Sequence, residues 1–380
     1  MNAKSKVYFP GLNGLRFFAA SMVIFHHVEQ YKFWSGISSA WGNAIIDSLG
    51  HQAVSFFFVL SGFLITYLLM VEHQKSGTIN LGKFYWRRIL RIWPLYFLIV
   101  AIAFFLAPMS KKLGFDIPSE ISLTALLSLI FLLPNLLRVM HPTLLGANQL
   151  WSVGIEEQFY AVWPILIRRF IGRIIPFLGA FIFIKLLLHW MLLIGVSVNI
   201  HPELLKLERI YALFPVEQMA VGGLGAALLY YQYDRIVSII LKKWVLVITM
   251  VLLIGSSVSG SHFVLKSYLD AVFFTIMLIH VVKRPELHVA LERKSLLHLG
   301  NISYGIYMWH TLVIALVLGL VNYLSLPINM WSNLIIHATC FVLSVGLAHV
   351  SYKWYETPFL KMKDRFAFDT ASLKRKWASQ

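Results

Sequence analysis

The sequence predicts an all-α fold, a polytopic membrane helix bundle with about ten transmembrane helices plus one re-entrant or interfacial segment. Of its 380 residues, 58% are hydrophobic and only 13% are charged, which is about half the charged share of a soluble domain. Apolar runs of about 20 residues, long enough to cross a bilayer as helices, recur along the whole chain. We therefore expect one transmembrane domain over residues 1–360 and a basic cytoplasmic tail over residues 361–380.

Positive charge indicates how the apolar segments cross the membrane. Both ends of the chain are rich in lysine and arginine, residues that concentrate on the cytoplasmic side of membrane proteins, so both termini are expected in the cytoplasm. The number of crossings must then be even. The eleven apolar segments are residues 12–29, 50–71, 86–107, 122–137, 150–167, 174–197, 210–232, 243–259, 264–282, 300–322 and 330–352.

The segment 122–137 is the weakest candidate for a crossing. It is short and contains Pro134 and Asn135. Counting it as a crossing would place the arginines of 168–173 outside, against the charge rule, so we expect it to be re-entrant or interfacial. The sequence shows no internal repeat, which argues against transporter folds that are built from inverted repeats.

The net charge of +16 has two readings. It fits the ordinary excess of positive charge in cytoplasmic loops, and part of it fits an anionic substrate or lipid headgroup; neither reading needs a nucleic-acid partner. Cys340 is the only cysteine, so an intrachain disulfide is excluded. The scattered histidines show no metal-ligand spacing, and we expect no metal.

The first apolar segment carries Arg16 and His27, eleven residues apart. Eleven residues make about three helical turns, so both side chains face the same way, about 16 Å apart along the axis. Ionisable groups inside a membrane are costly and usually mark a functional site. The pair indicates an anion-binding group and a proton-transfer group. His26 is adjacent to His27 and leaves some ambiguity about which histidine acts.

A second cluster lies at the predicted cytoplasmic entrance. Arg88 and Arg91 are three residues apart and therefore neighbours on one helical face. Two guanidinium forks suit phosphate, which they bind through two oxygens at a time. An ordinary basic anchor at the membrane edge explains the same pattern equally well.

A third cluster opens the segment 150–167 with two adjacent carboxylates, Glu156 and Glu157. Acids near a helix N-terminus complement the helix dipole, which accounts for one of them. Glu156 shares a face with Tyr160, four residues on, and a buried carboxylate there can orient a sugar hydroxyl or a catalytic imidazole.

Two further features have competing interpretations. Ser61 and Gly62, like the glycines of 222–225, are more typical of close helix packing than of a reactive site. Tyr307 and His310 share a helical face, and a lone helical histidine is more often a hydrogen-bonded structural group than a functional one.

These motifs, in this order over about 350 residues, resemble the acyltransferase-3 family of integral membrane acyltransferases. One departure is Val153, which stands where the family motif has leucine. The matching residues are Arg16 and His27, Arg88 and Arg91, then Trp151, Ser152, Glu156 and Tyr160.

The resemblance implies an O-acyltransferase that moves an acyl group, usually acetyl, from cytoplasmic acyl-CoA to a hydroxyl of a carbohydrate or glycolipid at the outer side of the membrane. It implies a bacterial inner-membrane location. Many family members add an SGNH-type domain, and we expect none fused to this chain. The expected roles are catalysis by His27 and Glu156, binding of acetyl-CoA by Arg16, Arg88 and Arg91, and acceptor binding by Trp151, Ser152, Glu157, Tyr160 and His310.

Within this reading, His27 is the general base for the acceptor hydroxyl and Glu156 orients or charge-balances it; an acyl-histidine intermediate is the alternative. The strongest rival is a proton-coupled transporter or flippase of a lipid-linked or acylated sugar, with Arg16, His27 and Glu156 as a proton relay. A structural membrane partner without catalysis is the third reading. The acyl chain, the acceptor hydroxyl and the oligomeric state are left open by the sequence.

Overall fold

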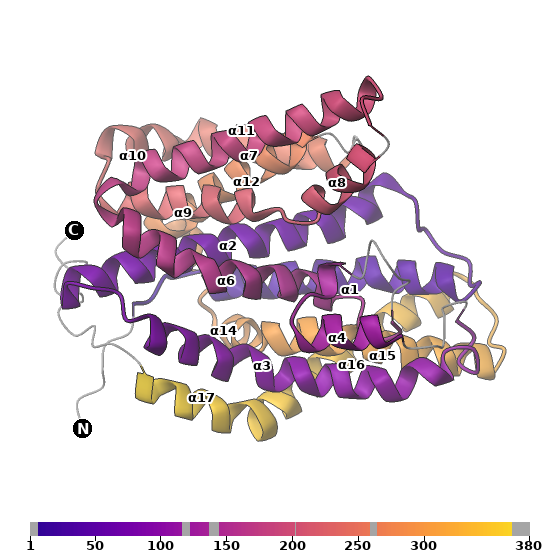
Figure 1. Cartoon of the computed structure of the whole chain (residues 1–380). Helices are drawn as coiled ribbons and strands as arrows, with labels where there is room; N and C mark the ends of the chain where they lie inside the picture. The colour runs from indigo at the N-terminus through magenta and orange to yellow at the C-terminus, as the bar shows by residue number, and fades with distance from the viewer. Residues whose placement is uncertain (1–6, 116–121, 137–143, 202, 259–263, 367–380) are drawn as a thin grey trace.

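A computed structural model describes residues 7–115, 122–136, 144–201, 203–258 and 264–366 of the chain. Within these ranges every regular element is a helix and there is no strand, which confirms the predicted fold class. The helices run side by side along the long direction of the molecule (Figure 1). Their bounds are α1 Leu12–Trp34, α2 Ala44–Ser76, α3 Leu81–Leu106, α4 Leu123–Ile130, α6 Leu150–Phe170, α7 Ile174–Ser197, α8 Glu203–Ala212, α9 Val216–Tyr230, α10 Asp234–Ile240, α11 Lys243–Val258, α12 Val264–Lys283, α13 Pro285–His288, α14 Lys294–Asn301, α15 Ser303–Tyr323, α16 Met330–Ser351 and α17 Thr357–Lys363.

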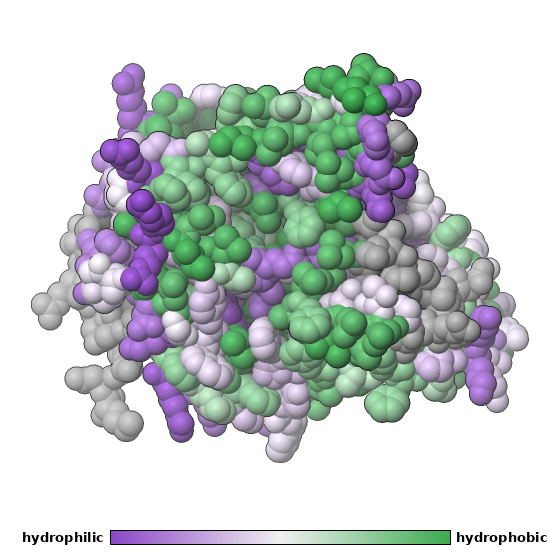
Figure 2. Space-filling view, in the orientation of Figure 1, coloured by the Kyte–Doolittle hydropathy of each residue, from purple (hydrophilic) through white to green (hydrophobic). Residues whose placement is uncertain are grey.

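The surface of the bundle is suited to lipid. Helices α7, α11 and α16 expose large apolar side chains along their length, which a water-soluble protein would bury. Figure 2 shows hydrophobic residues over much of the visible face, with hydrophilic residues gathered toward the two ends of the helices. Examples on the three helices are Phe183, Ile184, Trp190, Val247, Val251, Ile254, Leu334, Ile335 and Val342. The chain is a multi-pass integral membrane protein.

The number of crossings differs from the prediction. Among the described residues, seven helices are long and apolar enough to cross a membrane, or eight if the bent pair α10–α11 is one span. That count treats the 48-residue stretch Leu150–Ser197 as a single span and does not include the charged helix α1. The expected ten crossings are not confirmed by this count and stay a prediction.

Where it is described, the weak segment 122–137 forms the short helix α4, and residues 134–136 are helical again after a break. Helix α4 has eight residues, which span about 12 Å and cannot cross about 30 Å of hydrocarbon. This length is consistent with the expected non-crossing segment. Residue 137 of the segment and most of the expected tail 361–380 lie outside the described residues.

Helices α2 and α9 cross at the closest contact in the core. A Cβ atom on Gly62 would lie 1.9 Å from the carbonyl oxygen of Met219, and one on Gly222 would lie 2.1 Å from that of Val59. Backbone meets backbone here, so only glycine fits at either position. The predicted packing role of these glycines is confirmed.

Helix α1 lies inside the bundle, although it carries charged and polar residues. It packs against α2, α14, α15 and α16. Near its end, buried polar groups are paired: Glu29 Oε1 accepts a hydrogen bond from Lys32 at 2.8 Å and lies 3.1 Å from His337 Nε2 on α16. At its start, the Gly11 backbone N–H donates to Glu292 at 2.6 Å. These pairs fix α1 in the position from which Arg16 and His27 reach the core.

Candidate active site

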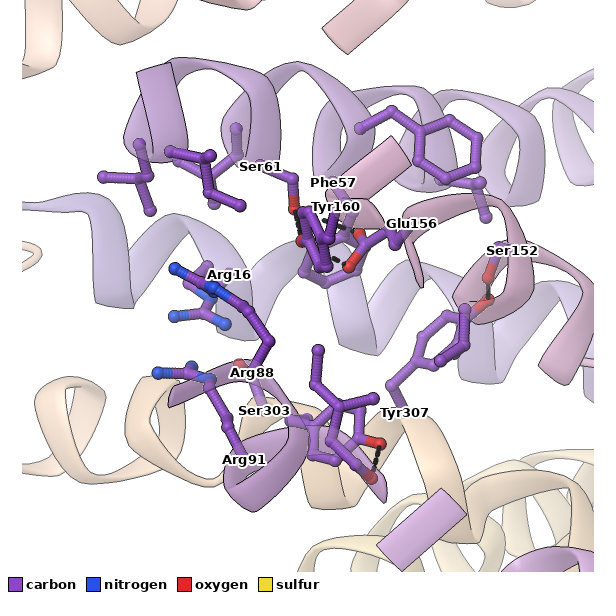
Figure 3. A pocket seen from close by; sticks show the side chains of 18 of the residues that line it. Arg16, Phe57, Ser61, Arg88, Arg91, Ser152, Glu156, Tyr160, Ser303 and Tyr307 are labelled. Atoms are coloured by element: carbon purple, nitrogen blue, oxygen red, sulfur yellow. Dashed lines mark hydrogen bonds between the residues drawn. The ribbon is translucent and has the colours of Figure 1, made fainter. Parts of the chain in front are cut away.

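A polar cavity of about 180 Å³ lies in the middle of the bundle (Figure 3). Five helices distant in the sequence form its wall: α1, α2, α3, α6 and α15. Its charged and polar lining consists of Arg16, Ser61, Arg88, Arg91, Ser152, Glu156, Tyr160, Ser303, Tyr304 and Tyr307. The rest of the wall is apolar, so these groups face one another in a confined space.

Three arginines gather on one side of the cavity. Figure 3 shows the guanidinium groups of Arg16, Arg88 and Arg91 close together, with Arg16 arriving from α1 and the other two from α3. Arg16 Nε and Arg88 Nε are buried and have no hydrogen-bond partner among the described residues. Buried donors without partners are uncommon and call for an acceptor. The structure thus brings the three predicted donor-binding arginines together at one place.

A carboxylate faces this group, held by two hydroxyls. Glu156 Oε1 accepts a hydrogen bond from Ser61 Oγ at 3.0 Å, and Glu156 Oε2 accepts one from the Tyr160 hydroxyl at 2.8 Å. The guanidinium of Arg88 stacks over the Tyr160 ring, 5.2 Å from its centroid. The predicted shared face of Glu156 and Tyr160 is present. With three cations and one carboxylate on the wall, the cavity favours an anionic ligand.

Ser61 lines the cavity, although the sequence favoured a packing role for it over a reactive one. A signal for its role exists in the sequence. The α2 side chains that line the cavity recur every three or four residues, as on one helical face, and Ser61 is the only hydroxyl on that otherwise apolar stripe. The other members of the stripe are Val54, Phe57, Phe58, Leu60, Leu64, Ile65 and Leu68.

His27 lies beside the cavity rather than on its wall. Its Nδ1 is 2.9 Å from His310 Nε2, and His310 Nδ1 is 2.6 Å from the carbonyl oxygen of Tyr307. The hydroxyl of Tyr307 reaches the cavity, where it is 2.6 Å from Ser152 Oγ. Tyr307 therefore connects the histidine pair to the cavity. His310, not Glu156, is the hydrogen-bond partner that the structure gives to His27, because Glu156 binds Ser61 and Tyr160 instead.

These hydrogen bonds fix the position of the imidazole protons. A carbonyl oxygen can only accept, so the proton of neutral His310 is on Nδ1 and its Nε2 is an acceptor. The proton between the two rings is then on His27 Nδ1, which also lies 3.2 Å from the Val23 carbonyl oxygen. His27 Nε2 consequently carries a lone pair, as a general base requires.

Besides His310, two of the predicted acceptor-binding residues do not line this cavity. The carboxylate of Glu157 turns away from the cavity and accepts a hydrogen bond from Trp93 Nε1 at 2.7 Å. The ring of Trp151 packs against Phe58, with ring centroids 6.2 Å apart, and lines a second cavity. Among the described residues no cluster of three or more histidine, cysteine or carboxylate side chains has the geometry of a metal site.

Comparison with known proteins finds O-acetyltransferases among the relatives of this chain. The peptidoglycan O-acetyltransferase OatA of Listeria monocytogenes is 26% identical over 94% of this chain and 56% of its own length. The O-acetyltransferase OatA of Staphylococcus aureus is 27% identical over 93% of this chain and 57% of its own length. The chain thus spans a little over half the length of these curated relatives. No solved structure matches it.

The family comparison covers most of the chain. The acyltransferase-3 model, described as an acyltransferase domain, matches residues 9–352. The matched range contains all five helices of the cavity and both histidines beside it. The chain belongs to the acyltransferase-3 family.

Proposed function

We propose that this protein is a membrane O-acyltransferase that transfers an acyl group, most simply acetyl, from acyl-CoA to a hydroxyl of a carbohydrate. The observation that carries the proposal is the cavity of α1, α2, α3, α6 and α15, whose wall holds an arginine cluster and which Tyr307 connects to an adjacent histidine pair whose protonation suits a base. The names of the relatives, which are O-acetyltransferases, support a hydroxyl acceptor and, for one of them, peptidoglycan.

The donor is assigned by charge and by hydrogen-bonding capacity. CoA carries phosphates, and guanidinium groups bind phosphate oxygens in pairs. Arg16 Nε and Arg88 Nε supply buried donors that lack a partner within the described chain, and Arg91 adds a third positive charge. We infer that acyl-CoA enters from the cytoplasmic side, because the lysine and arginine of both chain ends favour a cytoplasmic location for the termini. The membrane is then the bacterial cytoplasmic membrane.

The reaction follows from the protonation of His27. Its Nε2 removes the proton of the acceptor hydroxyl as that oxygen attacks the thioester carbonyl. The tetrahedral intermediate collapses with cleavage of the C–S bond, and the CoA thiolate takes the proton from the imidazolium. An ester and free CoA result. His310 is a positioning residue that fixes the His27 tautomer, and Glu156 holds the hydroxyls of Tyr160 and Ser61 beside the arginines.

The test of catalysis is acetyl transfer in isolated membranes. Labelled acetyl-CoA is supplied on the cytoplasmic face of vesicles that carry wild type or His27→Ala. We expect label in glycan from the wild type only, since the variant lacks the base. The variant must still bind labelled CoA and elute from size-exclusion chromatography as the wild type does. Transfer by His27→Ala at the wild-type rate contradicts the mechanism. Proton-gradient-dependent movement of glycan without acyl transfer would favour the transporter reading.

The donor site has its own test with a matched control. Arg88→Lys keeps the charge but loses the guanidinium fork, so we expect CoA binding to weaken about tenfold. Arg87→Lys is the control, because Arg87 is the neighbouring residue but pairs with Glu72 at 2.8 Å and does not line the cavity. Equilibrium binding of labelled CoA to the purified protein measures both. Equal affinities of the two variants would remove the phosphate assignment of Arg88.

A further inference from the structure

A second and larger cavity lies next to the first one. Its volume is about 360 Å³, and residues of α2, α6, α7, α8, α9 and α12 line it. It includes residues of α8, which Figure 1 shows at the end of the bundle opposite α17. Val54 and Phe58, one turn apart on α2, line both cavities. The two spaces are therefore separated by a wall about one side chain thick.

The charged groups of the second cavity are of both signs. Lys185 Nζ is 3.9 Å from Glu217 Oε2, and His189 Nε2 is 3.5 Å from Glu208 Oε1. Near Ser256, the Lys266 ammonium donates to the backbone carbonyl of that residue at 2.8 Å. The hydroxyl of Ser256 donates to Asp270 Oδ1 at 2.9 Å. Two lysines and three carboxylates line this cavity, so it has no excess of positive charge, in contrast to the arginine-rich first cavity.

Hydrogen-bonding capacity remains unused on this wall. Gln218 Nε2 donates to Ser267 Oγ at 2.7 Å, and Ser267 Oγ donates to Glu217 Oε1 at 3.2 Å. This chain of bonds shows which oxygens lack a hydrogen bond, although Glu217 Oε2 still faces Lys185 Nζ at 3.9 Å. Gln218 Oε1, Glu217 Oε2 and the Tyr268 hydroxyl are buried and have no hydrogen-bond partner among the described residues.

The three side chains that carry these atoms are almost inaccessible to solvent. Glu217 and Gln218 are each 5% exposed, and Tyr268 is 6% exposed. Buried polar atoms without partners carry a free-energy cost, which a bound ligand would offset by supplying the missing hydrogen bonds. Two of the atoms only accept, so the ligand must offer hydroxyl or amide hydrogens. Tyr268 can both donate and accept.

We propose that the second cavity is the acceptor subsite and binds a neutral, hydroxyl-rich sugar unit. Sugar hydroxyls can donate to Gln218 Oε1 and Glu217 Oε2 and can exchange hydrogen bonds with Tyr268. With three carboxylates and two lysines on its wall, this cavity lacks the positive charge that an anion would need, and it suits a neutral ligand. This inference rests on the proposed acyl transfer. Movement of Phe58 would connect the acceptor to the donor cavity.

The test uses the purified full chain in nanodiscs and chitotetraose, a neutral oligosaccharide of N-acetylglucosamine, as the probe. Equilibrium binding of labelled chitotetraose and of labelled CoA is measured separately. We expect Tyr268→Phe and Gln218→Leu each to weaken chitotetraose binding about fivefold to tenfold, the effect of one lost hydrogen bond. CoA affinity should stay within twofold. Tyr230→Phe is the matched control, because it removes a hydroxyl from α9 that binds Gln74 and Met70 instead of this cavity.

The outcomes separate the two proposals. Chitotetraose affinity that is unchanged in both variants overturns the acceptor subsite. A wild type that binds CoA but not chitotetraose also overturns it, since the folded protein then does not bind the proposed class of ligand. A wild type that binds chitotetraose, with the expected loss in the variants, but does not bind CoA refutes the donor assignment and leaves the acceptor subsite standing. Circular dichroism and the size-exclusion profile confirm that each variant is folded.

Discussion

At the scale of single residues, the position of one proton decides whether His27 can act as a base. The Tyr307 carbonyl, His310 and His27 form a line of hydrogen bonds in which each group sets the protonation of the next. Without His310, His27 Nδ1 loses its shorter hydrogen bond of 2.9 Å, and the longer contact of 3.2 Å to the Val23 carbonyl oxygen holds the proton on Nδ1 less firmly. Catalysis therefore requires that His310 Nε2 accept a hydrogen bond from His27, and it does not require a charge on His310.

This arrangement predicts different activities for two variants of His310. His310→Ala removes the acceptor, and we expect the turnover number of acetyl transfer to fall about tenfold to a hundredfold. His310→Gln places an amide oxygen near the same point, which can accept from His27 Nδ1, so it should keep several times the activity of the alanine variant. The KM for acetyl-CoA should be unchanged in both variants, because the side chain at position 310 does not line the cavity that holds the three arginines. Steady-state kinetics in nanodiscs measures both constants.

A different pattern would refute the positioning role. If His310→Gln and His310→Ala lose activity equally while both proteins remain folded, the acceptor function of Nε2 is not what catalysis needs. If instead both variants fail to reach the membrane, His310 serves mainly to hold α15 against α1.

At the scale of helices, the site depends on how closely α2 and α9 approach. Ser61 lies beside Gly62, and Gly62 touches the backbone of α9 at Met219. Glu217 and Gln218, which line the second cavity, lie just before Met219 on α9. A single crossing therefore positions polar groups of both cavities.

Adding a side chain where α2 and α9 cross should destabilise the protein. Gly222→Ala puts a methyl group 2.1 Å from the carbonyl oxygen of Val59, a backbone atom that cannot rotate away. We expect a loss of about 2 kcal/mol in stability, typical of overpacking. Gly346→Ala on α16 is the control, since its Cβ meets no atom within 4 Å and alanine favours the helix. Thermal unfolding of the detergent-purified proteins measures the difference, and an equal midpoint for both variants would contradict the close contact.

The sequence predicted local relations between residues and missed those that depend on helix packing. The spacings of Arg88 to Arg91 and of Glu156 to Tyr160 lie within one helix, where 3.6 residues per turn fix which side chains meet. The expected support of His27 by Glu156 required two helices, α1 and α6, to approach at the right rotation. No periodicity specifies that rotation. Helix α15 supplies His310 to His27 instead, while Glu157 turns toward Trp93.

At the scale of the whole molecule, the two cavities and the two ends of the bundle define a direction for transfer. The second cavity includes residues of α8, and Figure 1 shows α8 and α17 at opposite ends of the bundle. The basic residues of α17 favour the cytoplasmic side for that end. An acceptor that enters near α8 and a donor that enters from the other end would meet where Phe58 separates the cavities.

This direction predicts which residues a membrane-impermeant maleimide reaches in intact cells. In a Cys340→Ser background we expect labelling of Glu203→Cys on α8 and no labelling of Lys361→Cys on α17 until the cells are permeabilised. Both native side chains are exposed, so the new thiols are accessible on their own side. Protection of Glu203→Cys together with labelling of Lys361→Cys would reverse the assigned direction.

Labelling with the same reagent also tests whether segment 122–137 crosses the membrane and whether α6 and α7 are separate crossings. Lys111 follows α3 and Arg169 ends α6, and both are exposed. If segment 122–137 does not cross, only α6 separates them, so Lys111→Cys should label from outside and Arg169→Cys only after permeabilisation. A crossing by segment 122–137 would put both on one side. If Leu150–Ser197 were one span, its 48 residues would extend about 72 Å, more than twice the hydrocarbon thickness, and Arg169 would lie within lipid. Labelling of Arg169→Cys after permeabilisation would exclude that arrangement and establish α6 and α7 as separate crossings.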